Sequence, residues 1–148
     1  MVSLIDCGTP KLRQRFENVA EDLNGDDPAF VPPFPGGIAK YLAPNSAFQR
    51  CQGTIHPLLA VRDGQPVGRI AAIINRSHNA LRGDTTGFFG FFESENDPAT
   101  AEILFEAAAK ILRREGLTTI RGPYNPSIND ECGLLTDHFE IPPCNGLI

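Results

Sequence analysis

The side chains with the clearest potential for acid–base chemistry lie at two places in the sequence. Glu93 and Glu95 follow a run of aromatic residues, at a point where a strand would end. A carboxylate there can take a proton from a bound group, directly or through a water molecule, and the alternative is a solvent-exposed acidic loop. Tyr124 follows a second, shorter apolar segment. Its phenol can act as a proton donor, and the alternative is a half-buried tyrosine in a turn.

Other groups of polar residues give weaker signals. Asp137 and His138, with Ser127 or Cys132, contain the residue types of a catalytic triad, but no Gly-x-Ser-x-Gly turn accompanies them. Cys132, His138 and Cys144 contain the residue types of a zinc site without its usual ligand spacing. Widely spaced cysteines are typical of ordinary reduced thiols. We therefore expect neither a triad nor a metal site.

Residues 87–122 are expected to form the framework that positions Glu93 and Tyr124. Aromatic residues fall on both faces of a strand at residues 88–92, so both faces should be covered, and Gly90 suggests a bulge or a close approach of another group. Asp97 followed by Pro98 is typical of a helix start. Helical spacing of apolar residues then continues to about residue 112, before a second strand. This order predicts a βαβ unit with parallel strands.

The rest of the chain is predicted to complete an α+β (mixed α/β) fold, in which an antiparallel meander leads into the parallel βαβ unit and helices cover both faces. The other predicted strands are residues 2–6, 56–62 and 67–75. The other predicted helices are residues 10–23 and 38–42 and a short helix near residues 128–133. Residues 75–84 are predicted to be a polar loop. Arg69, among apolar neighbours, is expected to pair with a carboxylate or to reach a ligand.

Length and composition limit the classes of protein that this chain can represent. The 148 residues fit one domain over residues 1–148. The net charge of −5, from 13 basic and 18 acidic residues, argues against a nucleic-acid partner, because phosphate binding favours a basic patch. The apolar run at residues 70–74 is too short to cross a membrane, and no signal-peptide pattern is present. We therefore expect a cytoplasmic protein with no nucleic-acid or membrane partner.

Several segments of the sequence resemble a group of uncharacterised bacterial proteins with the GNAT (Gcn5-related N-acetyltransferase) fold. The matching segments are DPAFVPP (27–33), AVRDGQPVGRIAA (60–72), GFFGFFE (87–93), IRGPYNPSINDECGLL (120–135) and FEIPP (139–143). Members of this group are usually longer and continue beyond the Pro-Pro pair. The resemblance therefore implies that the later helix and strands of the fold are missing here, and that an exposed sheet edge pairs with the rest of a longer protein or with a second copy in a homodimer.

The resemblance implies an acyl-CoA-dependent N-acyltransferase that moves an acetyl group from acetyl-CoA to a small-molecule amine acceptor. The catalytic residues would be Glu93, as the base for the amine, and Tyr124, as the proton donor to the leaving thiolate. The cofactor-binding residues would be Gly90, Phe91, Phe92, Glu93, Ser94, Asn96 and Asn125. The alternatives are a non-catalytic GNAT-like module that binds a ligand or partner and an inactive fragment that pairs through its sheet edge.

The turn that would bind the phosphates of acetyl-CoA differs from the pattern of the group. Members usually have Gln/Arg-x-x-Gly-x-Gly/Ala, whose backbone amides approach the pyrophosphate at the start of a helix. This chain has the residues ESENDP at positions 93–98. Three carboxylates would then face a phosphate, and each pair would repel by about 1 kcal/mol at 4 Å in water. A bound cation or a differently placed ligand would be needed to accommodate the cofactor.

Overall fold

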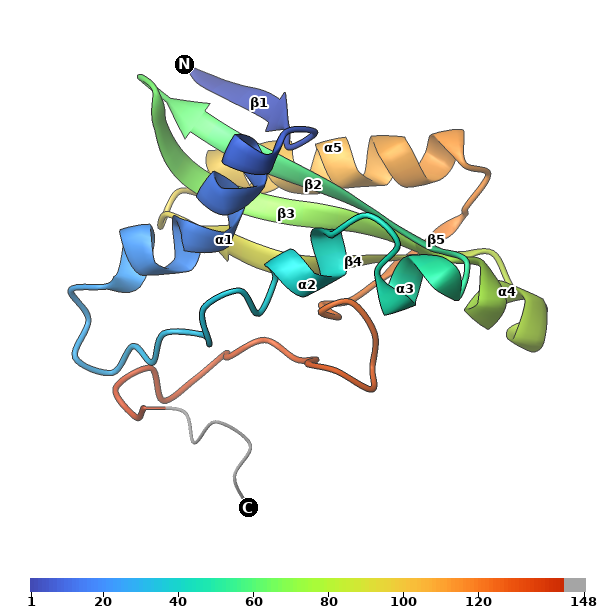
Figure 1. Cartoon of the computed structure of the whole chain (residues 1–148). Coiled ribbons are helices and arrows are strands. Elements are labelled where there is room, and N and C mark those ends of the chain that lie inside the picture. The colour runs from blue at the N-terminus through green and yellow to red at the C-terminus, as the bar shows by residue number, and fades with distance from the viewer. Residues whose placement is uncertain (143–148) are drawn as a thin grey trace.

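The computed structural model describes residues 1–142 and contains a mixed five-stranded sheet with the strand order β1-β2-β3-β4-β5. The strands are β1 (Val2–Asp6), β2 (Gly53–Arg62), β3 (Gln65–Asn75), β4 (Thr86–Ser94) and β5 (Thr119–Arg121). The helices are α1 (Pro10–Asn24), α2 (Ala39–Leu42), α3 (Ala47–Arg50), α4 (Arg76–Arg82) and α5 (Pro98–Arg114). Strands β1 to β4 pair antiparallel in chain order, whereas β4 and β5 are parallel (Figure 1). The predicted α+β class and the order of its sheet are confirmed.

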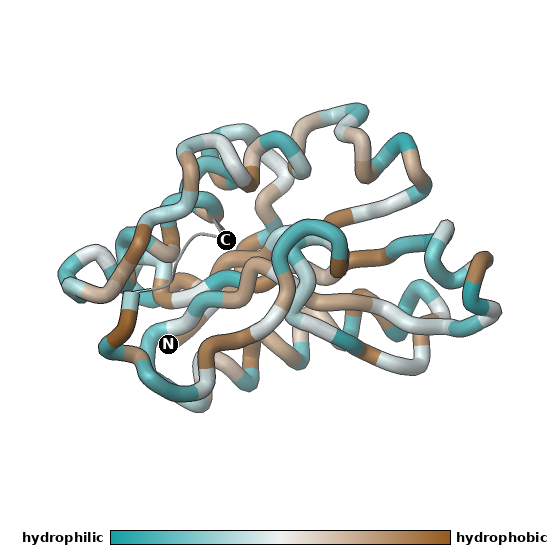
Figure 2. The backbone as a smooth tube through the Cα atoms, turned by 90° about the horizontal axis from the view of Figure 1, so that it is seen from below, coloured by the Kyte–Doolittle hydropathy of each residue, from teal (hydrophilic) through white to brown (hydrophobic). Residues whose placement is uncertain are grey.

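Helices α1 and α5 cover opposite faces of the sheet and give the molecule two hydrophobic cores (Figure 1). On the α1 side, Phe16 is fully buried against Leu59 and its neighbours. On the α5 side, Leu104 packs in the same way with Ile70. Each such side chain contributes about 1.5–3 kcal/mol through its removal from water. Hydrophobic stretches run through the middle of the molecule (Figure 2), and most residues of the central strands β2 and β3 are buried or half-buried.

The βαβ unit predicted for residues 87–122 is present. Thr86 and Phe88 of β4 lie opposite Thr119 and Arg121 of β5 in parallel register. Asp97 caps α5, and Pro98 occupies the first helical turn, where its missing N–H has no cost. Because β5 is short, its end at Arg121 lies beside Phe88, and β4 continues beyond it to Ser94.

Two local predictions were wrong. The polar loop predicted for residues 75–84 is helix α4, whose start is capped by the Asn75 side chain and whose end has Gly83 in the left-handed conformation. The short helix predicted near residues 128–133 is absent, and this part of the chain forms turns with one isolated bridge between Tyr124 and Cys132. The Ser127 side chain bonds to Asp130, which favours a turn over a helix. Helix α3 was not anticipated.

The segment after β5 lies below the sheet in Figure 1 and faces the loop that connects α1 with α2. All residues of β5 are exposed, and within residues 1–142 its outer edge pairs with no other strand. No helix in the described part of the chain combines the length and hydropathy needed to span a membrane. The zinc site that we considered and did not expect would include Cys144, which lies outside the described residues. Among residues 1–142, no group of His, Cys, Asp or Glu side chains is placed to hold a metal ion.

Candidate functional site

Strand β4 contains a bulge beside its pairing with β3. Arg69 lies opposite Glu93, but Ala71 lies opposite Gly90, so β4 has one residue more than β3 over this interval. The extra residue leaves Phe91 with φ of 52°, a left-handed conformation that is uncommon for a residue with a bulky side chain. The bulge suggested by Gly90 is therefore present, and it is centred on the next residue.

The chain after β5 approaches the bulge closely. A Cβ atom at Gly90 would overlap the carbonyl oxygen of Tyr124 and lie 2.9 Å from Oδ1 of Asn125. The backbone N–H of Tyr124 donates to the carbonyl of Phe89 at 2.9 Å, and the N–H of Phe91 donates to the Asn125 side chain. Glycine is required at position 90 because any side chain would push these two segments apart.

Arg69 connects the bulge to α1 from inside the molecule. Its Nε donates to the carbonyl of Phe91 at 3.0 Å, and its Nη1 donates to the carbonyls of Phe16 and Glu17 at 2.7 and 2.9 Å. The residue is only 4% exposed, and burial lowers the pKa of its guanidinium despite the nearby carboxylates. From the sequence, we expect Arg69 to pair with a carboxylate or to reach a ligand. In the structure its hydrogen bonds go to backbone carbonyls.

Glu93 lies where the bulge opens toward α1. Its Oε1 is 3.9 Å from Nη2 of Arg69, and its Oε2 accepts a hydrogen bond from Asn24 at 3.3 Å. Burial raises the pKa of the Glu93 carboxyl, and this effect exceeds the opposing influence of Arg69 and Asn24. A carboxylate with a raised pKa accepts a proton more readily near neutral pH than an exposed one does.

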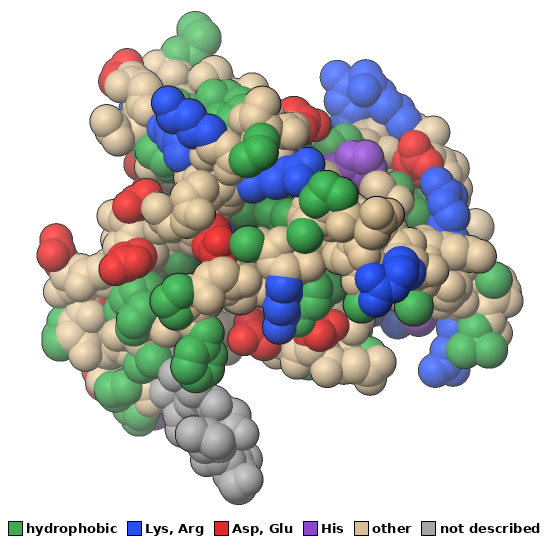
Figure 3. All heavy atoms as spheres, in the orientation of Figure 1, with side chains coloured by type: hydrophobic (Ala, Val, Ile, Leu, Met, Phe, Trp, Pro, Cys, Tyr) green, Lys and Arg blue, Asp and Glu red, His purple; other side chains and the backbone are tan. Residues whose placement is uncertain are grey.

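A cleft of about 680 Å³ opens beside Glu93. Its walls come from the bulge of β4, from the loop and short helix at residues 30–41, and from residues 125–131. Aromatic and apolar side chains dominate, and they include Phe30, Val31, Phe34, Ile38, Tyr41, Phe91 and Phe92. Polar side chains lie between them, and five of these are charged: Lys40, Arg69, Glu93, Asp130 and Glu131, with Asn125 as the sixth. On the face drawn in Figure 3, charged side chains of both signs likewise lie among hydrophobic ones. A cleft that combines apolar walls with convergent polar groups is the usual form of a small-molecule site.

The two tyrosines of this region have different positions. Tyr124 packs on Phe88 with ring centroids 5.4 Å apart and is not among the residues that line the cleft with Glu93. Tyr41, which the sequence did not indicate, does line the cleft and donates to Asp130 at 2.8 Å. Burial, followed by the hydrogen bond to Asp130, raises the pKa of the Tyr41 hydroxyl.

The other residues predicted to bind the cofactor divide between this cleft and a second one. Phe91 and Asn125 line the main cleft with Glu93, whereas Ser94 and Asn96 line a more open hollow of about 610 Å³ at the start of α5. Phe92 lies between the two and lines both. Gly90, by contrast, packs against the Tyr124 backbone and lines neither of the two hollows.

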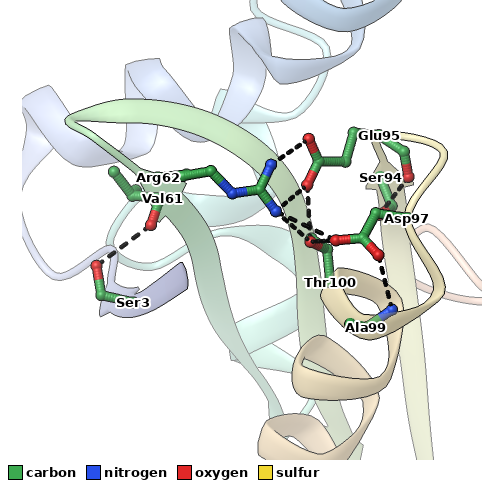
Figure 4. A network of polar contacts seen from close by, with 8 residues as sticks. All are labelled: Ser3, Val61, Arg62, Ser94, Glu95, Asp97, Ala99 and Thr100. Carbon is green, nitrogen blue, oxygen red and sulfur yellow. Dashed lines mark hydrogen bonds and ion pairs between the residues drawn. The ribbon is translucent and has the colours of Figure 1, made fainter. Parts of the chain in front are cut away.

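Two carboxylates at the start of α5 are engaged by side chains of the protein itself (Figure 4). Nη2 of Arg62 lies 2.7 Å from Oε1 of Glu95 and 3.1 Å from Oδ2 of Asp97. The hydroxyl of Thr100 lies 2.7 Å from Glu95 and 2.9 Å from Asp97. The Thr100 hydrogen bond, helped by Arg62, lowers the pKa of the Glu95 carboxyl, and the Thr100 bond also lowers that of Asp97. Both groups are therefore ionised at neutral pH.

The fold is that of the GNAT acyltransferases. The chain superposes on a tandem GNAT protein from the clavulanic acid biosynthesis pathway with a TM-score of 0.59 at 12% identity, covering 81% of this chain and 35% of that one. It superposes on a GNAT-family acetyltransferase from Staphylococcus aureus Mu50 with a TM-score of 0.57 at 9% identity, covering 84% and 74%. An acyl-CoA N-acyltransferase from Pseudomonas aeruginosa gives a TM-score of 0.52 at 16% identity, covering 81% and 75%. The GNAT fold that the sequence resemblance implied is confirmed.

Two curated proteins are similar in sequence. A bacterial ceramide synthase from Caulobacter vibrioides is 37% identical over 145 residues, which is 96% of this chain and 37% of that protein. Protein YghO from Escherichia coli is 37% identical over 126 residues, which is 82% of this chain and 31% of that protein. The chain thus spans about a third of the length of these relatives. No protein-family model matches it.

The start of α5 does not fit the diphosphate of acetyl-CoA. Pro98 has no N–H to offer, and the N–H of Ala99 is bonded to the Asp97 carboxylate at 3.1 Å. The N–H groups of Thr100 and Ala101 bond to the Asp97 carbonyl at 3.1 and 3.2 Å. The donors that a helix start normally presents to a phosphate are therefore already in use.

Proposed function

We propose that this chain is the amine-binding part of an N-acyltransferase, in which the main cleft holds an amine with an apolar substituent and Glu93 takes its proton as the amide forms. The observation that carries the proposal is the Glu93 carboxylate, which lies beside the β4 bulge in a cleft with aromatic walls and has a raised pKa. The GNAT fold and the similarity to a ceramide synthase support the proposal, because a ceramide is the amide of a long-chain amine.

The chemistry requires a base because a protonated amine has no free electron pair. Transfer of the proton to Glu93 lets the amine nitrogen attack the carbonyl carbon of an acyl thioester; the C–N bond forms, the C–S bond breaks, and the thiol leaves with a proton. The aromatic and apolar side chains of the cleft suit an apolar chain, and the carboxylates of Glu93, Asp130 and Glu131 suit an ammonium group. Acetyl-CoA and a small amine, as implied by the resemblance, are the simplest reactants of this kind.

Calorimetric titration with a long-chain 2-amino-1,3-diol and with its N-acetylated form tests the binding step. We expect the free amine to bind at least tenfold more tightly than the N-acetyl form, because only the amine can be protonated and pair with Glu93. Glu93→Gln should remove that preference, whereas Glu102→Gln, an exposed glutamate on α5, should keep it. Equal affinity for the two compounds in the unchanged protein would show that the cleft does not select an amine.

A second candidate function is a non-catalytic module that binds the same amine. The occupied helix start of α5 favours it, since the usual diphosphate contact of an acyl-CoA is not offered there. Incubation with the amine and acyl-CoA thioesters of two to sixteen carbons separates the two functions. Released thiol together with the amide in the mass spectrum supports the acyltransferase, and amine binding without either product supports the module.

Pairing through the outer edge of β5, which is unpaired within residues 1–142, remains a separate prediction. Ile120 lies in this strand and is 42% exposed. An unpaired strand edge is a natural surface for association with another strand. Size-exclusion chromatography with light scattering at increasing concentration tests for the homodimer, and a monomer at every concentration would contradict it.

A further inference from the structure

We infer that the anion site at the start of α5 is filled by the protein's own Asp97 carboxylate, with Arg62 as its counter-ion, so that this chain does not hold the diphosphate of coenzyme A at this place. The inference concerns a surface different from the amine cleft. It does not depend on the function proposed for Glu93, and either one can be wrong without the other.

The Asp97 carboxylate uses the donors that a phosphate oxygen would need. Its Oδ1 accepts from the N–H of Ala99 at 3.1 Å, and its Oδ2 lies 2.9 Å from the hydroxyl of Thr100. A backbone amide and a hydroxyl in the first turn of a helix are typical donors to a bound phosphate. Thr100 is fully buried, so its hydroxyl is fixed in this arrangement (Figure 4). An anion built into the chain thus takes the place of an external one.

Arg62 is likewise committed to the protein. Nη1 of Arg62 donates to Oε2 of Glu95 at 2.8 Å while Nη2 lies 2.7 Å from Oε1, which is a two-point contact between guanidinium and carboxylate. The same Nη2 is 3.1 Å from Asp97. One positive charge is therefore shared between two negative charges, and the cluster keeps a net negative charge toward solvent.

The charges of Arg62, Glu95 and Asp97 limit which ligands can bind in the hollow at the start of α5. Glu95 and Asp97 line the hollow of about 610 Å³ together with Pro98. A diphosphate placed there would meet two carboxylates and no free amide of the first helical turn. The hollow suits neutral or cationic groups, and the donor of an acyl group would have to be held by other contacts.

Anion binding measured by calorimetry tests the inference, with coenzyme A and inorganic pyrophosphate as probes. We expect no heat of binding for pyrophosphate up to about 1 mM with the unchanged protein. The double variant Glu95→Gln/Asp97→Asn keeps the shape of the side chains but removes both charges and releases Arg62. It should bind pyrophosphate at least tenfold more tightly than the unchanged protein. Glu102→Gln/Glu106→Gln removes the same charge from the exposed face of α5 and should bind no better than the unchanged protein.

Each possible outcome either supports or overturns the inference that coenzyme A is not held by its diphosphate at the start of α5. Coenzyme A that binds the unchanged protein with competition from pyrophosphate would overturn the inference. Coenzyme A that binds without such competition would support it, because the diphosphate would then make no contact at α5. A folded double variant, verified by its melting curve, that gains no affinity would also overturn it. If the double variant does not fold, the single variant Glu95→Gln takes its place, with a smaller but measurable gain expected over Glu102→Gln.

Discussion

Substitution of Gly90 by alanine tests the arrangement on which the main cleft depends. The added Cβ would overlap the Tyr124 carbonyl oxygen and lie 2.8 Å from its carbonyl carbon. These are backbone atoms, so no change of rotamer can relieve the overlap. Overpacking costs about 1–3 kcal/mol, and loss of the hydrogen bonds at Phe89 and Phe91 costs about 0.5–1.5 kcal/mol each. We expect a total loss of about 3 kcal/mol in the free energy of unfolding.

The loss should appear as a lower melting temperature. For a chain of this length each kcal/mol corresponds to about 2–4 °C, so Gly90→Ala should melt about 6–12 °C below the unchanged protein in a circular dichroism experiment. The matched control is Gly8→Ala, whose Cβ would meet only Oδ1 of Asp6 at 3.7 Å. If Gly90→Ala melts within about 2 °C of the unchanged protein, the close approach of Tyr124 to the bulge is not as described.

Further predictions concern the interior and the acidic cluster. Arg69→Met should lower the free energy of unfolding by about 2–4 kcal/mol, since it leaves buried carbonyls without a donor; urea denaturation measures this, and a loss below 1 kcal/mol would contradict it. Leu104→Ala should cost about 2–5 kcal/mol, whereas Leu81→Ala, at an 84% exposed position, should change stability by less than about 0.5 kcal/mol in the same assay. Because the pKa values of Glu95 and Asp97 are lowered below 4.5 and 3.8 in the folded state, their contribution is present above those values and lost as pH falls. The melting temperature of the unchanged protein should therefore fall more steeply below about pH 4 than that of Glu95→Gln/Asp97→Asn, and parallel curves would argue against the cluster.

The elements that the sequence predicted correctly are those with local signals. Asp97 and Pro98 specify the start of α5 by themselves, and the aromatic run of β4 indicates burial on both faces. Helix α4 was missed because its residues are almost all polar, and the helix depends on its two caps, Asn75 and Gly83. A polar composition was interpreted as a loop, although a cap at each end is also a local signal and was available in the sequence.

Contacts between distant parts of the chain could not be predicted in the same way. Tyr41 enters the cleft through a hydrogen bond to Asp130, 89 residues away. The acceptors of Arg69 are carbonyls of residues 16, 17 and 91, which carry no signature in the side-chain sequence. From the sequence alone, we take the carboxylates of Glu93, Glu95 and Asp97 to be exposed, and we therefore expect all three to face a phosphate. In the structure Glu95 and Asp97 contact Arg62, at the end of β2, so much of their charge is balanced within the fold.

Glu93 and Glu95 show that two glutamates close together in sequence can have different properties because their surroundings differ. They lie two residues apart at the end of β4, yet the pKa of Glu93 is raised and that of Glu95 is lowered. Burial beside the bulge disfavours the charge of Glu93, so folding favours its protonated form, and its contribution to stability is lost as pH rises through its folded-state pKa. Arg62 and Thr100 instead hold Glu95 ionised. Oppositely shifted neighbouring carboxyls are the arrangement in which one group can exchange protons while the other serves as a fixed charge. Of the two, only Glu93 lines the main cleft, so the role of proton acceptor that we propose falls to Glu93 and not to Glu95.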